Sequence, residues 1–229
     1  MADIGARIAR VREQIGEAAT RAGRDPSSVT LIGVSKTHPA EAVAEAVAAG
    51  VENVGENRVQ EAAEKVDRVR ELLGHDPTWH LIGTLQRNKA RQALDLFSLI
   101  HSVDSVRLAE ALASRAEGRQ VHVLLEVYLG TDAARPGFRS DTVGEALAAI
   151  AQLPSLDVRG LMTVAPLGLD REQTRAAFRQ LRELRDQLQD RHHLSLPELS
   201  MGMSEDFSLA ILEGATMIRV GRAIFGERD

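Results

Sequence analysis

Short apolar runs alternate along the chain with longer segments in which apolar residues recur every three or four positions. The first pattern is typical of buried strands, and the second indicates amphipathic helices. The runs predict eight strands, at residues 29–34, 51–54, 79–82, 97–101, 121–127, 158–162, 199–201 and 217–220. The longer segments predict helices at residues 4–22, 39–49, 59–73, 88–95, 106–115, 142–153, 171–189 and 207–213.

The order of these elements decides the fold class. Strict alternation of strand and helix favours parallel strands joined by right-handed crossovers. The eight units predict an α/β fold that closes into a single (β/α)8 TIM-type barrel, with residues 4–22 as an extra N-terminal helix. An open doubly wound sheet is the alternative. No linker rich in Pro, Gly or Ser divides the sequence, so we expect one domain over residues 1–229.

Composition narrows the functional classes. The chain is 44% apolar but only 3% aromatic, so its core is built mainly from Leu, Ile, Val and Ala. It has no cysteine, which excludes disulfides and thiolate metal sites, and no spacing of His, Asp and Glu indicates a metal site. The net charge of −5 and the scattered basic residues disfavour nucleic acid as a partner. Because no apolar stretch suits a membrane span and no signal-peptide pattern opens the chain, we expect a cytoplasmic protein.

Lys36 is the first candidate for chemistry. In barrels of this kind the chemistry lies where strands end and loops begin, and Lys36 follows the predicted strand at residues 29–34. Partial desolvation of a lysine amine favours its neutral, nucleophilic form, which can form a Schiff base with a carbonyl compound. A solvated lysine at a strand end is the alternative interpretation.

Arg219 interrupts the apolar run of the last predicted strand. A buried guanidinium is costly without a partner, so this residue either forms a structural ion pair or contacts a ligand. Because a guanidinium only donates hydrogen bonds, a pyridine nitrogen facing it must accept one and stays unprotonated. Such a ring is a weaker electron sink, which would restrain carbanion chemistry.

The loops after the last two strands are the usual phosphate site of such barrels. Gly221 permits close approach of the backbone, and a short helix beginning near Arg222 would direct N–H groups toward an anion. Ser204 follows the predicted strand at residues 199–201 and is predicted to be the N-cap of the next helix. Glu205 and Asp206 act against an anion there, since they compete for the same positive helix end.

These residues fall within longer motifs. The motifs include Val34-Ser35-Lys36-Thr37, Val54-Gly55-Glu56-Asn57, Trp79-His80-Leu81-Ile82-Gly83, Arg159-Gly160-Leu161-Met162-Thr163, Leu199-Ser200-Met201-Gly202-Met203-Ser204 and Arg219-Val220-Gly221-Arg222. In this order they resemble the pyridoxal 5′-phosphate (PLP) homeostasis proteins, which are fold-type III PLP-binding barrels similar to the N-terminal domain of alanine racemase. The resemblance extends from about residue 30 to residue 226.

The resemblance implies a protein that holds PLP as a Schiff base and serves intracellular vitamin B6 homeostasis without turnover of its own. It implies Lys36 as the Schiff-base lysine and Arg219 as the residue that faces the pyridine nitrogen. Ser204, Gly221 and Arg222 match the phosphate-binding positions, and Asn57 matches a position near the ring. PLP is then the cofactor, with PLP-dependent apo-enzymes as transient partners. We expect a monomer, because no apolar surface helix stands out in the sequence.

The chain departs from the family at two places. Arg222 stands where the family usually has a small hydroxyl residue, often threonine. The fifth strand and its loop read Glu126-Val127-Tyr128 and then Arg135-Pro136, where the family commonly has Gln-Val-Asn and a stretch with Ser and Lys.

Three other functions stay open. A racemase-like PLP enzyme needs a second acid or base, which in fold-type III racemases comes from a second domain of a partner subunit. We expect no such domain here, and the single tyrosine, Tyr128, is predicted to sit in a strand. An aldolase that uses Lys36 without PLP and a non-catalytic scaffold are the remaining alternatives.

Overall fold

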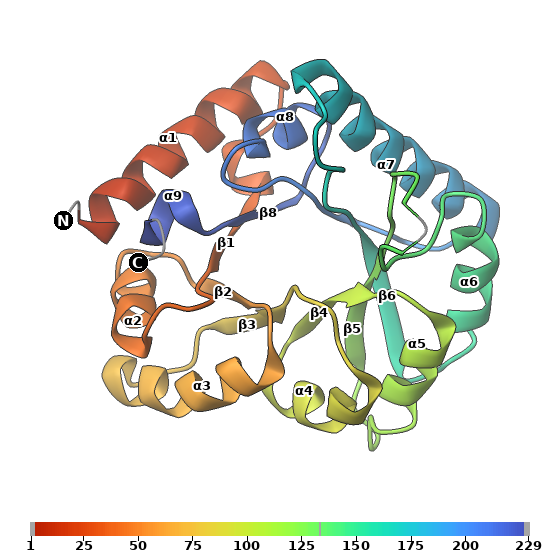
Figure 1. Cartoon of the computed structure of the whole chain (residues 1–229), viewed down its shortest axis with the longest axis horizontal. Helices are drawn as coiled ribbons and strands as arrows, with labels where there is room; N and C mark the ends of the chain where they lie inside the picture. The colour runs from red at the N-terminus through yellow and green to blue at the C-terminus, as the bar shows by residue number, and fades with distance from the viewer. Residues whose placement is uncertain (1–2, 133, 227–229) are drawn as a thin grey trace.

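The computed structural model describes residues 3–132 and 134–226, and its eight parallel strands form a closed barrel in chain order inside a ring of helices (Figure 1). The strands are β1 (Thr30–Val34), β2 (Asn53–Glu56), β3 (Thr78–Leu81), β4 (Leu99–Val103), β5 (Val121–Glu126), β6 (Leu156–Met162), β7 (Glu198–Ser200) and β8 (Met217–Val220). The helices are α1 (Ile4–Arg21), α2 (Ala40–Ala48), α3 (Val59–Leu73), α4 (Ala90–Leu96), α5 (Val106–Ala113), α6 (Val143–Ile150), α7 (Arg171–His192), α8 (Phe207–Leu212) and α9 (Arg222–Phe225). Two 3-10 turns, η1 (Pro26–Ser28) and η2 (Arg87–Lys89), complete the set. Of the predicted domain, residues 1–2, 133 and 227–229 lie outside the described part.

Closure takes place at the pair of first and last strands. Ile32 of β1 pairs with Asn53 of β2 on one side and with Arg219 of β8 on the other. The first strand thus pairs with the second strand on one side and with the last strand on the other. The sheet therefore has no open edge, as in a closed barrel. The predicted barrel is therefore confirmed, and the open doubly wound sheet is wrong.

Two apolar clusters hold the barrel together. The larger cluster lies between the strands and the surrounding helices, and Phe178 of α7 is among its fully buried side chains. The smaller cluster consists of Ile32, Leu99, Leu124, Met162 and Met217, one residue from each of five strands. These five strands alternate their side chains between the helix-facing side and the interior, as the period of two along a strand requires.

Helix α1 is the predicted extra N-terminal element, and it packs against α8 and α9 over the seam between β8 and β1 (Figure 1). Its buried residues are Ile8, Val11, Ile15, Ala18 and Ala19, which recur at helical spacing along one face. At its start, the Asp3 side chain accepts a hydrogen bond from the Gly5 N–H. The helix therefore covers the point at which the barrel closes.

Some predicted boundaries differ from the observed ones. The predicted strand at residues 51–54 begins and ends two residues early, because β2 includes the polar residues Asn53 and Glu56 that an apolar run omits. The two 3-10 turns are too short for a periodic signal and were not predicted. Helix α9 begins at Arg222, as expected for a short helix after β8.

A buried carboxylate joins α7 to the end of α8. The Glu213 side chain is only 3% exposed, and it accepts hydrogen bonds from three arginines on one face of α7. The Nε of Arg175 lies 2.5 Å from Glu213 Oε1, the Nη2 of Arg179 3.0 Å from Oε1, and the Nη1 of Arg182 3.2 Å from Oε2. This cluster fixes the first half of α7, which is the longest of the described helices.

We expect Glu213→Gln to lower the free energy of unfolding by roughly 2 kcal/mol, because three guanidinium groups lose their shared counter-charge. Glu183→Gln is the matched control, since Glu183 is exposed and lies 3.9 Å from Arg182. Denaturant unfolding of both variants measures the effect. Equal stability of the two variants would contradict a structural role for the cluster.

Candidate functional site

A cavity of about 1010 Å³ opens at the carboxyl ends of the strands. Its walls come from the strand ends and loops of β1, β2, β3, β5, β6, β7 and β8. The sequence-predicted site residues all line it: Lys36, Asn57, Ser204, Arg219, Gly221 and Arg222. Five basic side chains line the cavity against three acidic ones, namely Lys36, Arg58, Arg135, Arg219 and Arg222 against Glu126, Glu205 and Asp206. The excess of positive charge suits an anionic ligand.

Lys36 occupies the turn after β1, between two residues that are tied to the protein below them. The Ser35 hydroxyl is buried and donates to Glu56 Oε1 at 2.7 Å. On the other side, the Thr37 N–H donates to Glu61 Oε1, and Thr37 has a φ of 69°, which a non-glycine residue adopts only when its surroundings hold it there. The backbone on both sides of Lys36 is therefore fixed.

Lys65 of α3 connects these two attachment points. Its Nζ donates to Glu56 Oε1 at 2.7 Å, to Glu61 Oε1 at 2.8 Å and to the Ser35 carbonyl oxygen at 2.8 Å. Burial raises the pKa of Glu56, while the hydrogen bonds from Lys65 and Ser35 act in the opposite direction. Sequence reasoning missed this cluster, because a glutamate and a lysine nine residues apart form no recognisable motif.

Arg219 points from β8 into the interior of the barrel and is 4% exposed. Its Nη1 donates to Ser200 Oγ at 2.6 Å, and its Nη2 donates to the Thr163 carbonyl oxygen at 2.8 Å. Burial lowers the pKa of Arg219 to about 10, and the charges of Asp206 and Glu126 raise it. The guanidinium is therefore still cationic at neutral pH, and it reaches the cavity as a permanent hydrogen-bond donor.

Two half-buried carboxyl groups share the cavity with this guanidinium. Burial and the nearby Asp104 raise the pKa of Glu126 to about 6, against the opposing charges of Arg219 and Arg135. Burial also raises the pKa of Asp206, whereas its hydrogen bond from the Met203 N–H and the charge of Arg219 lower it. Neither group lies within ion-pair distance of Arg219 in the described residues, so both balance its charge from farther away.

The loops after β7 and β8 meet at one side of the cavity. The Ala223 N–H donates to Ser204 Oγ at 3.4 Å, which ties the two loops together. The prediction that Ser204 caps the next helix is wrong, because α8 begins at Phe207 with Asp206 as its N-cap. Two turn residues separate Ser204 from that helix, and its hydroxyl faces α9 instead.

Arg222 is held at the rim of the same region. Its Nη2 lies 2.5 Å from Glu205 Oε1, and both side chains are more than half exposed. The side chain that replaces the family's small hydroxyl residue is therefore paired with an acid of the neighbouring loop. It leaves the backbone at Gly221 and Arg222 open to the cavity wall.

Asn57 reaches the cavity because a glycine lies against it. A Cβ atom at Gly83 would stand 2.4 Å from the Asn57 carbonyl oxygen and 2.8 Å from its Cα, closer than any side chain tolerates. Only glycine lets the turn after β3 pass this close to the turn after β2. The other residues of the same motifs, His80, Met162 and Thr163, do not line the cavity but lie buried below it.

Tyr128 and the loop after β5 form another wall. Tyr128 was predicted to sit in a strand, but β5 ends at Glu126 and Tyr128 lines the cavity two residues beyond it. The Arg139 guanidinium lies 4.8 Å from the centre of its ring. Arg135 and Pro136 line the cavity as well, so both departures from the family pattern are found at its mouth.

Known proteins resemble this chain over nearly its whole length. A family model described as "Alanine racemase, N-terminal domain" matches residues 7–229. A "Pyridoxal phosphate homeostasis protein" of Aquifex aeolicus is 42% identical over 224 residues, which cover 97% of each chain. The structure of PipY of Synechococcus elongatus with PLP bound is 47% identical, with a TM-score of 0.87 over 97% of this chain and 100% of that chain.

The chain belongs to the pyridoxal phosphate homeostasis protein family. A protein of this family from Pseudomonas aeruginosa is 42% identical over the whole of this chain. An alanine racemase of Clostridium difficile is only 16% identical, with a TM-score of 0.73 and 57% of that chain covered, so its likeness shows the fold alone. The resemblance predicted from the motifs is thereby confirmed for the family.

Two further findings concern the part of the chain that the structure describes. None of its helices combines the length and apolar character that crossing a bilayer requires. Within the same residues, no group of three or more His, Asp and Glu side chains is placed to hold a metal ion.

We expect Lys65→Met to destabilise the protein by about 3 kcal/mol near neutral pH, because Glu56 stays buried without its cation. Loss of the lysine raises the pKa of Glu56 further above its unfolded value. A carboxyl group whose pKa is raised on folding destabilises the fold as the pH rises, so the deficit is larger at about pH 7 than at about pH 5. Urea unfolding at the two pH values measures it, with Lys89→Met as control, and a deficit that shrinks toward neutral pH would contradict the assignment.

Proposed function

We propose that this chain binds PLP in the cavity, with Lys36 as the point of covalent attachment, and serves PLP homeostasis without turnover of its own. One observation carries the proposal. The sequence contains three lysines, Lys36, Lys65 and Lys89, and only Lys36 lines the cavity that also contains Arg219. Lys65 is held by two carboxylates and a carbonyl oxygen, which leaves its amine no lone pair for attack.

The donors around the cavity fit the chemical groups of PLP. Bound PLP supplies an aldehyde carbon that an amine can attack and a pyridine ring that can withdraw electrons. Lys36 offers the amine, and Arg219 offers a permanent donor for the ring nitrogen. Asn57, on the adjacent wall, would lie near the ring.

The phosphate would be held where the loops after β7 and β8 meet. Ser204 offers a hydroxyl, and Gly221 and Arg222 offer backbone N–H groups at the same wall. The Arg222 side chain adds positive charge there, although Glu205 competes for it. The excess of basic residues around the cavity supports an anionic group at this position.

The absence of turnover follows from the charge of Arg219. A guanidinium with a pKa of about 10 does not accept a proton from a pyridinium, so the ring nitrogen stays unprotonated and withdraws electrons weakly. Relatives across the whole length of the chain are named homeostasis proteins rather than enzymes. We further propose that residues 1–229 act as one PLP-binding domain, monomeric and cytoplasmic, which transfers PLP to apo-enzymes.

The proposal is tested with the purified protein and added PLP. We expect a visible absorbance band, borohydride reduction that fixes PLP irreversibly, and a mass adduct on the peptide that carries Lys36. Lys36→Ala should lose the adduct with its fold intact, while Lys89→Ala should keep it. An adduct on Lys89 or none at all would exclude Lys36 as the attachment point.

Arg219→Glu tests the contact with the ring nitrogen. A carboxylate there would let the ring nitrogen hold a proton, so we expect the visible band of bound PLP to shift. Arg58→Glu makes the same charge change at an exposed wall residue and serves as the control. Circular dichroism shows whether each variant is folded. A folded Arg219→Glu protein with an unchanged spectrum would place Arg219 away from the ring.

One observation favours a second candidate function, a racemase-like enzyme. Lys36 follows β1 and Tyr128 follows β5, and these strands are four apart in an eight-stranded barrel, which places the two residues on opposite walls of the cavity. Removal and return of an α-proton on opposite faces needs such a pair. Deuterium exchange at the α-carbon of amino acids, present in the wild type and lost in Tyr128→Phe, would establish this activity.

A further inference from the structure

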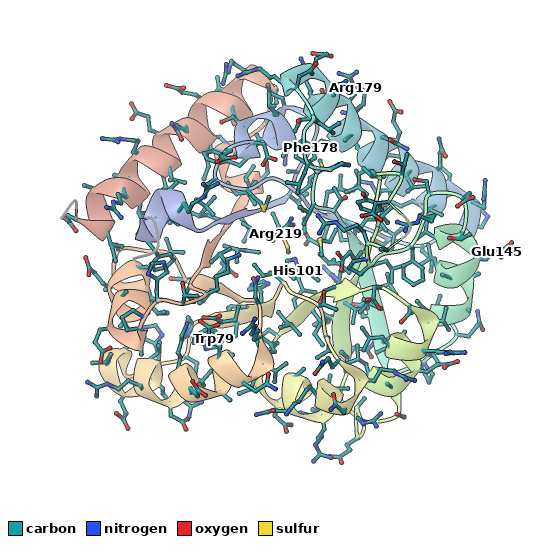
Figure 2. The ribbon with its side chains drawn as sticks, viewed as in Figure 1. Trp79, His101, Glu145, Phe178, Arg179 and Arg219 are labelled. Carbon is teal, nitrogen blue, oxygen red and sulfur yellow. The ribbon has the colours of Figure 1, made fainter. Side chains whose placement is uncertain are left out.

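A series of hydrogen-bonded side chains leads from Arg219 across the interior of the barrel to β2. Arg219 Nη1 lies 2.6 Å from Ser200 Oγ, and Ser200 Oγ lies 2.8 Å from His101 Nδ1. His101 Nε2 lies 3.0 Å from His80 Nδ1, whose Nε2 lies 3.0 Å from Asn53 Oδ1. Figure 2 shows His101 and Arg219 together inside the ring of strands. We call these five residues the interior relay.

The interior relay has one direction of donation, which its two ends set together. The Asn53 carbonyl oxygen only accepts and the Arg219 guanidinium only donates, and within the described residues His101 Nδ1 is the one acceptor left for the Ser200 hydroxyl proton. His101 then carries its proton on Nε2 and donates it to His80 Nδ1. His80 in turn carries its proton on Nε2 and donates it to the Asn53 carbonyl oxygen. Every donor in the series meets an acceptor when both histidines are Nε2–H tautomers.

Both histidines are neutral in this arrangement. Burial lowers the pKa of His80 to about 4, and burial together with the charges of His80 and Arg219 lowers the pKa of His101 well below its usual value. A second proton on His80 would set its Nδ1–H against His101 Nε2–H, and one on His101 would set its Nδ1–H against the Ser200 hydroxyl proton, so either would break the series. Arg219 is therefore the only charge in the interior relay at neutral pH.

The relay and Thr163 hold the guanidinium at two different nitrogens. Nη1 is held through Ser200, and Nη2 is held by the Thr163 carbonyl oxygen at 2.8 Å. Two hydrogen bonds at different nitrogens of a planar group restrict how it can turn. Of the five N–H donors of a guanidinium, two are used in this way within the described residues, and Arg219 also lines the cavity.

We propose that Ser200, His101 and His80 are positioning residues for Arg219, which hold its guanidinium in the orientation that donates a hydrogen bond to the aromatic ring nitrogen of the bound ligand. The inference rests on the proposed function, because the ring nitrogen is that of PLP. A purely structural role is the competing explanation, in which the relay only satisfies buried polar groups. Barrel interiors do not require polar residues for stability, and Ile32, Leu99 and Leu124 show the apolar solution in this same interior.

Ser200→Ala separates the two explanations, because it cuts the link between Arg219 and His101 and removes little volume. We expect PLP still to attach at Lys36 but to dissociate roughly tenfold faster, since one charge-assisted hydrogen bond no longer orients Arg219. The pH at which the visible band changes should shift as well. Ser200→Thr, which keeps the hydroxyl, should behave more like the wild type, and Met162→Leu, a packing change in the same interior, should leave both values unchanged.

A second measurement does not depend on PLP or on any variant. Nitrogen chemical shifts of the two histidines in the wild-type protein should report the neutral Nε2–H tautomer for both, from about pH 6 to about pH 8. An Nδ1–H tautomer of His101 would overturn the direction of the relay and with it the proposal.

The outcomes also distinguish the inference from the function on which it rests. Lysine labelling that fails in the wild type refutes the proposed function. Labelling at Lys36 in both proteins, with the same PLP dissociation rate and the same spectrum in Ser200→Ala, refutes the positioning role alone and leaves the relay structural.

Discussion

The guanidinium of Arg219 is a permanent charge inside a barrel whose neighbouring interior residues are largely apolar. Burial of such a charge is unfavourable unless hydrogen bonds and opposite charges compensate for it. The structure supplies both, through Ser200 and the Thr163 carbonyl oxygen at hydrogen-bond distance and through Glu126 and Asp206 from farther away. Strands and loops on several sides of the barrel thus contribute polar atoms to one group.

A different network positions Lys36, and it likewise combines hydrogen bonds with opposite charges. Glu56, Glu61 and Lys65 hold the residues on both sides of it, and the Lys36 side chain itself lines the cavity. In the proposed function, one network orients the hydrogen-bond donor for the ring of PLP, and the other fixes the backbone beside the lysine that attacks PLP. Because both networks are anchored on strands, on the residues that directly follow them and on α3, Lys36 and Arg219 keep a fixed relation to each other.

The barrel could be predicted from the sequence, because the spacing of apolar residues is a local property of the chain. It located all eight strands, with boundaries within a few residues, and Lys36 and Arg219 were conspicuous as polar residues at or within apolar runs. Ser204 was misassigned because a cap depends on where the helix starts, and Asp206 also fits the N-cap preference. The interior relay was out of reach because Ser200 and His101 are 99 residues apart in sequence and meet only across the closed barrel.

Arg219 is also relevant to whether a protein only binds PLP or catalyses a reaction with it. Carbanion chemistry on PLP needs a strong electron sink, and a ring nitrogen that accepts a hydrogen bond from a guanidinium is a weak one. Misplacement of that donor would free the nitrogen to take a proton and strengthen the sink. In the proposed role, a relay that keeps Arg219 oriented would do more than retain the ligand, because it would also keep the ligand unreactive until its release. On this view the interior relay is the part of the protein that would distinguish a carrier from an enzyme of the same fold.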